Sequence, residues 1–261
     1  STVEITENMP KPLFGKPGFH IGGGKPVWLS TLTATDDDTG RVIYSCDYVK
    51  EEEIFPLGAG TVEGNEFKLD GTGRIFPKAD SFAVRKEIVC KKKPIGAKLF
   101  VSGLGVFTPY INGKLAENTV DGKSFAYQLM PGSTEPRVRR QYYTYDLGEA
   151  LNEGVNTISA IVTSGWWSDL VCTSHGIKNG FLAKLVVTYA DGSEETVITD
   201  ESWKADVDGC PNGYTSIFYG ETYDARIGLD FTKNGYDDSS WKNAVINNEF
   251  IGDISTGFKG A

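Results

Sequence analysis

The chain has 261 residues, of which 39% are hydrophobic and 12% aromatic, and its formal net charge is −9. This negative charge argues against a nucleic-acid or anionic-membrane partner, because both need a clustered positive surface. No apolar run reaches the roughly 18 residues that a membrane-spanning helix requires. The chain contains 31 glycines but only two histidines and two methionines, a composition that favours β-strands over helices.

The first part of the chain predicts irregular structure. Residues 1–24 contain Pro10, Pro12 and Pro17 without hydrophobic periodicity, so we interpret them as an N-terminal extension with one short strand at most. Residues near 50–78 are rich in glycine and glutamate and depart from the pattern that follows. They fit either an insertion into a single β-domain, which we favour, or the end of a small separate N-terminal β unit.

From residue 27 onward, short alternating segments are separated by turn residues. Period-two alternation with β-branched and aromatic side chains predicts strands at residues 84–90, 97–101, 157–162, 182–189 and 195–198. Asx-Gly pairs predict tight turns, and they occur at residues 70–71, 112–113, 121–122, 191–192 and 234–235. Helical turns are expected only at 147–151 and 239–242. This spacing of short strands predicts an all-β protein, with a jelly-roll β-sandwich over residues 25–245. Residues 246–261 are expected to be a truncated linker toward a following domain.

The four cysteines, Cys46, Cys90, Cys172 and Cys210, are widely spaced and form no CxxC pair. A zinc cluster is therefore not expected, and buried free thiols are the simpler interpretation. The compartment is left open.

Catalytic motifs are sparse in this sequence. A nucleophilic triad needs a histidine, but only His20 and His175 are available, and no GxSxG motif occurs. Cys172 lies three residues before His175, a spacing that we attribute to coincidence. Acidic pairs are numerous, but each lies in a charged run, so none stands out as a glycosidase acid and base. The best calcium candidate is the loop at residues 206–209, although no EF-hand pattern fits.

The segment Trp166-Trp167-Ser168-Asp169 follows a strongly apolar strand. Two adjacent tryptophans in a strand cannot both face the core, because neighbouring side chains point to opposite faces. Sugars stack their apolar faces on aromatic rings while carboxylates and amides bind the hydroxyls. We therefore predict a carbohydrate site at Trp166, Trp167 and Asp169, with Tyr110 and Asn112 as weaker additions. The alternative is that both indole rings pack under a loop.

A series of motifs, taken in order, resembles the N-terminal β-sandwich region of bacterial α-L-rhamnosidases. The motifs are AKLFVSGLG (97–105), YINGK (110–114), LMPG (129–132), RQYYTYDL (140–147), EGVN (153–156), SGWW (164–167), LAKLVVTYADG (182–192), TDESWK (199–204), YGETYDAR (219–226) and DDSSW (237–241). The resemblance covers residues 80–245 and implies a galactose-binding-domain-like jelly roll.

The resemblance also carries functional implications. The acid and base of that family lie in an (α/α)6 barrel further along the chain, so the barrel of the parent chain is the implied partner. Some members bind L-rhamnose with calcium through a sandwich of this type, so calcium is the one cofactor implied. This sequence departs from the family pattern at Ser133, where tryptophan is common, and at Ser164, where Asp or Asn is frequent.

The cluster Glu221, Tyr223, Asp224 and Arg226 combines acidic, basic and aromatic side chains within six residues. We interpret it as an ion-paired docking surface, and the resemblance implies that it faces the next domain of the parent enzyme; the alternative is a sugar contact.

The leading hypothesis is a non-catalytic accessory module that binds rhamnose-containing glycans or buttresses the catalytic domain. Two alternatives remain open. One is a free-standing lectin or adhesion module, and the other is a glycosidase in its own right.

Overall fold

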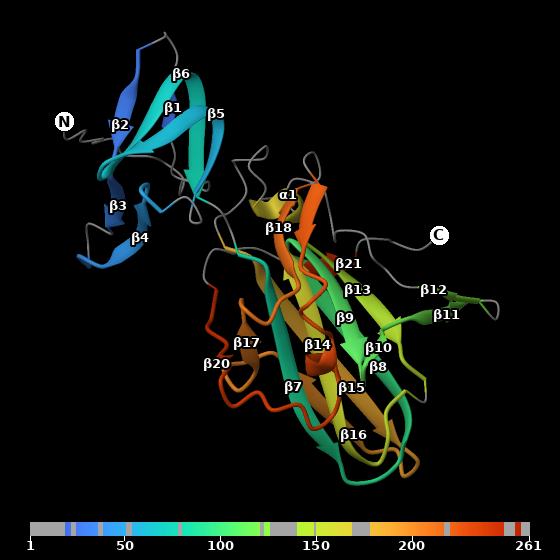
Figure 1. Ribbon diagram of the computed structural model, residues 1–261. Coiled ribbons are helices and arrows are strands. Elements are labelled where there is room, and N and C mark those ends of the chain that lie inside the picture. The colour runs from blue at the N-terminus through green and yellow to red at the C-terminus, as the bar shows by residue number, and fades with distance from the viewer. Residues whose placement is uncertain are drawn as a thin grey trace.

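The computed structural model describes residues 19–21, 25–35, 39–50, 54–77, 80–120, 123–125, 140–148, 150–168, 178–216, 220–247 and 254–256. The regular secondary structure of these residues is almost entirely β-strand, and the strands fall into two groups (Figure 1). The first group, β1–β6, is called the N-terminal β unit below. The second group, β7–β21, forms a β-sandwich. The prediction of an all-β fold is confirmed.

The N-terminal β unit is built on one long hairpin. Its strands are β1 (Phe19–Ile21), β2 (Val27–Leu29), β3 (Thr31–Thr35), β4 (Val42–Asp47), β5 (Ile54–Glu63) and β6 (Glu66–Pro77). β6 pairs with β5 along most of its length and also with β1 and β2, while β3 and β4 form a separate hairpin. A small core buries Leu29, Cys46, Tyr48, Phe67 and Leu69.

This pairing differs from the single β-domain that we favoured from the sequence. β6 pairs with β1 and β2, and β1 is a short strand within residues 1–24, where one short strand at most was expected. Phe67 and Leu69 of this hairpin are buried together with Leu29, Cys46 and Tyr48, in a cluster separate from the core of the sandwich. The long hairpin was obscured in the sequence because Asp70-Gly71, expected as a turn, lies inside β6.

The sandwich consists of two sheets. Its strands are β7 (Phe82–Cys90), β8 (Pro94–Leu104), β9 (Val106–Ile111), β10 (Lys114–Leu115), β11 (Asn118–Val120), β12 (Lys123–Phe125), β13 (Arg140–Asp146), β14 (Gly154–Thr163), β15 (Gly180–Tyr189), β16 (Glu194–Ile198), β17 (Lys204–Asp206), β18 (Asn212–Ser216), β19 (Gly220–Tyr223), β20 (Lys242–Asn243) and β21 (Ile254–Thr256). One sheet has the order β10-β9-β14-β7-β17-β20 and the other β16-β15-β8-β13-β21, while β11 with β12 and β18 with β19 form separate two-stranded sheets. β7, β8 and β9 alternate between the two sheets, as do β13, β14 and β15, which is the chain path of a jelly roll.

Side chains that alternate along the strands fill the space between the sheets. On β8, Leu99 and Val101 face inward, and on β15 Leu185 and Val187 do the same. Trp203 is buried in this core and donates its indole N–H to the carbonyl oxygen of Ile198 at 2.9 Å. The strands predicted from alternation all lie within β7, β8, β14, β15 and β16, so these predictions are confirmed.

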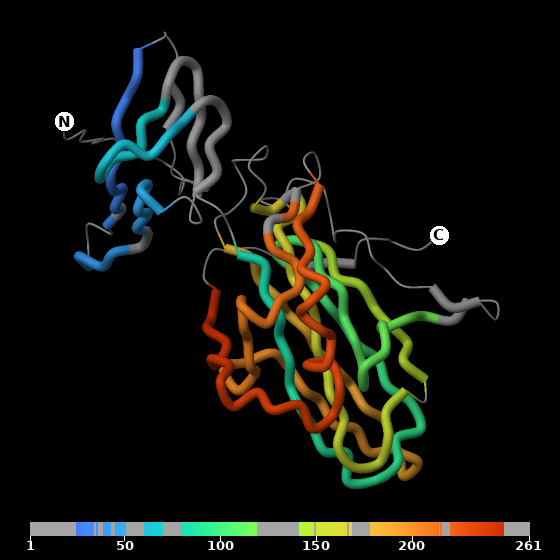
Figure 2. The backbone as a smooth tube through the Cα atoms, viewed as in Figure 1, coloured from blue at the N-terminus to red at the C-terminus, as the bar shows by residue number. Residues whose placement is uncertain are grey.

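The outer face of the six-stranded sheet is covered by the chain segment between β17 and β20, whose path can be followed in Figure 2. This segment carries the 3-10 helix η2 (Asp230–Thr232), and Phe231 and Trp241 pack on Ala83 and Ile161. β14 is therefore buried on both faces from Asn156 onward. Trp241 thus packs on the outer face of the six-stranded sheet.

Several local predictions need correction. Neither 147–151 nor 239–242 forms a helical turn among the described residues; both are tight turns, closed by bonds from Ala150 N to Leu147 O and from Trp241 N to Asp238 O. Helical turns occur instead in η2 and in α1 (Gly165–Ser168), where the sequence contains no helix-favouring run. The expected linker beyond residue 245 contributes β21, which pairs in parallel with β13.

Cys46, Cys90 and Cys210 are buried, and Cys90 and Cys210 are free thiols, as expected. Cys172 and His175 lie outside the described residues. No helix in the described part of the chain is long and apolar enough to cross a membrane.

Candidate functional site

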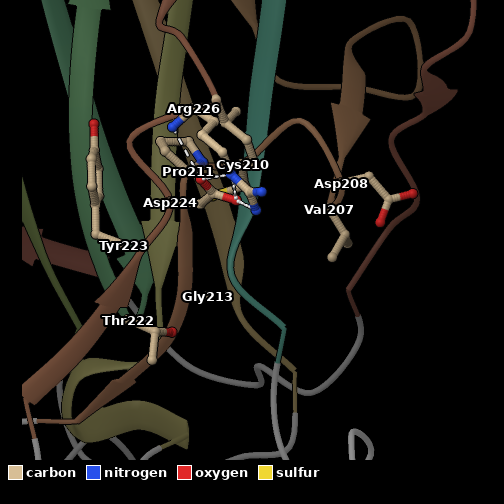
Figure 3. Close-up of a pocket in the computed structure, with 10 residues that line it drawn as sticks. Val207, Asp208, Cys210, Pro211, Gly213, Thr222, Tyr223, Asp224 and Arg226 are labelled. Atoms are coloured by element: carbon tan, nitrogen blue, oxygen red, sulfur yellow. Dashed lines mark hydrogen bonds and ion pairs between the residues drawn. The ribbon is translucent and has the colours of Figure 1, made fainter.

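An open pocket of about 570 Å³ lies beside the β18–β19 hairpin (Figure 3). Its lining comes from the loop after β17, from the hairpin and from the turn that follows β19. The lining residues are Val207, Asp208, Cys210, Pro211, Gly213, Thr222, Tyr223, Asp224, Arg226 and Ile227. We call this the docking pocket, because three of the four predicted interface residues line it.

Local hydrogen bonds fix the loop between β17 and β18. The carboxylate of Asp206 accepts the N–H of Gly209 at 2.7 Å, and Cys210 N donates to Val207 O at 3.1 Å. A Cβ on Gly209 would lie 2.8 Å from the Asp206 carboxylate and 3.1 Å from the Trp241 ring, so a larger residue here would require these side chains to shift. The turn places Cys210 against the sheet, where burial raises the pKa of its thiol to about 11.

An ion pair forms the rim of the pocket. Nε of Arg226 donates to Oδ1 of Asp224 at 2.8 Å and Nη2 donates to Oδ2 at 2.5 Å, a bidentate arrangement. These hydrogen bonds lower the pKa of Asp224, which therefore stays charged at neutral pH. Because the Arg226 side chain is 90% exposed, the pair contributes little to the stability of the fold.

Tyr223 and Glu221 lie on the exposed strand β19. Tyr223 is 53% exposed, which is unusual for a large aromatic side chain. Glu221 is not a lining residue; its Oε2 accepts a hydrogen bond from Asn212 Nδ2 at 2.9 Å across the hairpin. Burial, and after it the charge of the Tyr223 phenol, raise the pKa of Tyr110.

The described side chains of the predicted carbohydrate segment are buried, unlike the exposed Tyr223 and Arg226 at the docking pocket. Trp167 is only 4% exposed, and its indole N–H donates to Lys178 O at 2.7 Å. Ser168, also buried, hydrogen bonds through its hydroxyl to Asn179. The Trp167 ring is therefore buried and is not presented to solvent. The side chain of Trp166 and the whole of Asp169 lie outside what the structure describes.

Asn112 is at the first position of the β9–β10 turn, with a left-handed φ of 50°. Its Nδ2 donates to Ala150 O at 3.1 Å and to Asn156 Oδ1 at 2.8 Å, and its Oδ1 accepts the N–H of Thr157 at 2.9 Å. The amide is therefore committed to joining three chain segments. Tyr110 packs in part on the Phe231–Trp241 cluster. Asn112 and Trp167 have different hydrogen-bond partners and therefore belong to separate networks.

Among the described residues, no group of three or more His, Cys, Asp or Glu side chains is placed to hold a metal ion. In the loop at residues 206–209, the Asp206 carboxylate accepts the N–H of Gly209.

The comparison with known proteins decides the family. The α-L-rhamnosidase N-terminal domain profile matches residues 92–256. The chain belongs to the α-L-rhamnosidase N-terminal domain family. An α-L-rhamnosidase from Alteromonas sp. (strain LOR) is 33% identical over 168 residues, which cover 62% of this chain and 17% of the relative. One from Streptomyces avermitilis is 34% identical over 176 residues, which cover 65% of this chain and 16% of the relative. The chain therefore spans about one sixth of the length of these relatives.

Solved structures agree with the family assignment. The α-L-rhamnosidase from Dictyoglumus thermophilum superposes with a TM-score of 0.62 at 26% identity, covering 80% of this chain and 21% of that protein. The Streptomyces avermitilis α-L-rhamnosidase complexed with L-rhamnose gives a TM-score of 0.56 at 19% identity, covering 91% of this chain and 29% of that protein. At 19% identity the second match shows the fold alone. The sandwich fold is thus that of the N-terminal parts of α-L-rhamnosidases.

Sequence reasoning missed the apolar lining of the docking pocket, which Val207, Pro211 and Ile227 provide. These residues have no local signal, because the loop after β17 and the turn after β19 meet only through tertiary contacts. One of these contacts is the bond from Asp224 N to Pro211 O at 2.9 Å.

Proposed function

We propose that this chain is an accessory, non-catalytic module of an α-L-rhamnosidase, and that its docking pocket receives the catalytic part of the parent enzyme. The observation that carries this proposal is the family match together with coverage of only about one sixth of the relatives. The rest of each relative, more than four fifths of its length, is long enough to contain a catalytic domain.

The geometry of the docking pocket supports a protein partner. Val207, Pro211 and Ile227 give it apolar walls, and Tyr223 presents an exposed ring at its edge. The Asp224–Arg226 pair adds a polar rim. An apolar centre with a polar rim is the usual anatomy of a protein interface, and arginine and tyrosine are enriched in such surfaces.

The docking role is tested in a chimera. The segment of the Streptomyces avermitilis enzyme that aligns with this chain is replaced by the corresponding residues of this chain, and hydrolysis of an aryl α-L-rhamnoside and the melting midpoint are measured. The double variant Tyr223→Ala/Arg226→Ala is expected to lower the midpoint of the chimera while leaving the isolated chain unchanged. Lys98→Ala, exposed on the other sheet, is the matched control. Equal midpoints for the double variant and the control would contradict docking through this pocket.

The absence of catalysis is tested on the chain alone. No acid and base pair stands out in the sequence, so the isolated chain is expected to release no product from an aryl α-L-rhamnoside. Turnover that survives repeated purification would favour the alternative, a glycosidase in its own right.

Carbohydrate binding is the second candidate function, favoured by the structural similarity to an enzyme complexed with L-rhamnose. NMR titration of the isolated chain with L-rhamnose, with and without calcium, tests it. Shifts that appear only with calcium would place an ion in the site, and shifts at Trp166, Trp167 and Asp169 would support the predicted residues. If no resonance shifts at tens of millimolar sugar, only the docking role remains. If sugar binds but the chimera shows no docking, a free-standing lectin is favoured.

A further inference from the structure

The N-terminal β unit carries an exposed tryptophan that the family match over residues 92–256 does not include. Trp28 lies on β2 and is 47% exposed. Its neighbour Leu29 is buried in the small core with Phe67 and Leu69. Because side chains alternate across a strand, Trp28 is directed to the solvent face of the sheet, where the core cannot cover it.

The register of the hairpin gathers polar side chains around this ring. Trp28 and Thr61 both lie directly opposite Lys68, from the two strands that flank β6 (Figure 1). Residues directly opposite one another share a sheet face. Glu63, at the end of β5, reaches the same group. These four side chains form what we call the Trp28 platform.

Contacts within the Trp28 platform hold the indole in place. The indole N–H of Trp28 donates to Oε2 of Glu63 at 3.4 Å, and Lys68 Nζ donates to Oε1 of Glu63 at 3.1 Å. The Lys68 ammonium also lies 5.8 Å from the centroid of the indole ring, a cation–π distance. An aromatic ring positioned before a ligand arrives loses less conformational entropy on binding.

The charge balance of the platform indicates the chemistry of its ligand. The carboxylate of Glu63 and the ammonium of Lys68 neutralise each other, so a ligand needs no charge of its own. The exposed indole favours a ligand with a flat apolar face, while the carboxylate, the ammonium and the Thr61 hydroxyl can exchange hydrogen bonds with hydroxyl groups. A pyranose ring has both features: C–H bonds on one face and hydroxyls around its edge.

We propose that the Trp28 platform is a saccharide-binding site for neutral glycans, separate from the docking pocket and from the Trp166–Asp169 segment. The sugar ring stacks on the indole of Trp28, and Glu63 and Lys68 bind its hydroxyls. This proposal rests on the proposed function in one respect: an α-L-rhamnosidase acts where glycans are present. Because the surface is open, binding is expected in the millimolar range.

The test is an NMR titration of the full chain that follows the indole N–H resonances of its five tryptophans. The probes are L-rhamnose and neutral cello-, manno- and galacto-oligosaccharides, each up to tens of millimolar. The Trp28 indole resonance, assigned from its loss in Trp28→Ala, is expected to shift in fast exchange with at least one probe. Trp28→Ala is expected to weaken that binding at least about tenfold, while Trp28→Tyr keeps part of it.

Matched controls separate this site from the others. Lys68→Met should weaken binding without unfolding the unit, which the amide spectrum reports. Tyr223→Ala, in the docking pocket, should leave the shift unchanged. Because the ion pair is internal, 0.5 M salt should change the affinity less than about twofold. An unchanged Trp28 resonance with every probe would overturn the proposal.

A protein partner for the Trp28 platform is the competing outcome. In a chimera extended to include the N-terminal β unit, Trp28→Ala is expected to leave the melting midpoint unchanged, whereas Tyr223→Ala/Arg226→Ala lowers it. If Trp28→Ala lowers the midpoint instead, the platform is a contact with another domain and the saccharide proposal fails. Docking through the pocket is tested separately by the Tyr223→Ala/Arg226→Ala variant.

Discussion

Arg85 is a buried charge that joins β7 to the covering segment. Its side chain is 1% exposed, and Nε donates to Phe231 O at 2.9 Å, while the guanidinium also pairs with Glu87 and Asp238. The Tyr236 ring lies 5.5 Å from its central carbon. A buried charge remains in a fold only when it is paired and hydrogen bonded, so we infer that Arg85 holds residues 231–238 on the sheet.

Replacing Arg85 by methionine is expected to lower the free energy of unfolding of the sandwich by about 3–5 kcal/mol, because Glu87 and Asp238 lose their buried partner. Urea unfolding followed by circular dichroism measures this change. Lys98→Met, at an exposed position of the same sandwich, should cost less than about 0.5 kcal/mol. A loss below about 1 kcal/mol for Arg85→Met would mean that the covering segment is held by its apolar contacts alone.

Glu87 makes the stability of this contact depend on pH. Partial burial raises the pKa of its carboxyl, but hydrogen bonds from Gly235 N and Arg85 outweigh burial, so the net pKa is lowered. A lowered folded-state pKa stabilises the protein above the unfolded pKa, near 4.5, and this stability is lost as the pH falls through the folded value.

The Glu87→Gln variant is therefore expected to be less stable than the unmodified chain at pH 7 and to lose less stability between pH 5 and pH 3. Urea unfolding across this range measures both slopes. Other carboxyls with lowered pKa values, such as Asp191 and Asp224, titrate in both proteins and cancel in the comparison. Parallel pH profiles for the two proteins would show that Glu87 contributes nothing to acid unfolding.

At the scale of elements, the chain must cross from one sheet to the other after each of several strands. β8 passes into β9 at Gly105, whose φ is 121°, a backbone conformation that other residues rarely adopt. A Cβ at this position would lie 2.1 Å from the carbonyl oxygen of Thr163 on β14. Gly105 thus allows both the change of direction and the close approach of the neighbouring strand.

Substituting Gly105 by alanine is expected to destabilise the sandwich by more than about 3 kcal/mol, because backbone strain and a clash with backbone atoms add together. The matched control is Gly192→Ala in the β15–β16 turn, where φ is 80° but an added Cβ would meet no atom within 4 Å. That variant should lose only about 1–2 kcal/mol. Melting curves of the two variants compare the effects, and equal losses would show that the clash is relieved by movement of β14.

For the whole molecule, the main feature is that the N-terminal β unit and the sandwich each bury a hydrophobic core. The described core of the unit contains five buried residues, whereas the sandwich has a much larger one between its sheets. A small domain buries a lower fraction of its surface and is correspondingly less stable. The two parts are therefore expected to differ in stability.

Phe67→Ala removes a side chain that is 1% exposed at the centre of the small core. Such truncations cost about 3–5 kcal/mol, a large fraction of the stability of a small unit. Calorimetry is expected to show the transition of the N-terminal β unit shifted or lost, with the sandwich transition unchanged. A shift of both transitions would mean that the two parts unfold as one.

The local pattern was sufficient for five strands of the sandwich, namely β7, β8, β14, β15 and β16. β8 and β15 alternate clearly because one face of each meets the core and the other meets water. The pattern was insufficient for the N-terminal β unit, since β6 contains Asp70-Gly71, a turn signal, and pairs with strands from three segments. The alternation of a strand does not specify its partner.

The candidate site was predictable in part. The cluster around Tyr223, Asp224 and Arg226 was visible because its charged and aromatic residues are contiguous. The burial of Trp167 and the hydrogen bonds of Asn112 were not, because their partners, Lys178 and Ala150, lie in separate segments. Trp28 was overlooked because a single tryptophan in a short apolar run resembles a core residue.

The sequence by itself determined that this acidic, glycine-rich chain is all-β, and the order of its motifs was enough to suggest its family. These properties depend on local alternation and on residue order, which the sequence records directly. Only the tertiary structure decided which side chains are exposed: Trp167 is buried, whereas Trp28 and Tyr223 are open to solvent. Exposure depends on which distant segments cover a residue, and that is settled only when the sheets pair and pack.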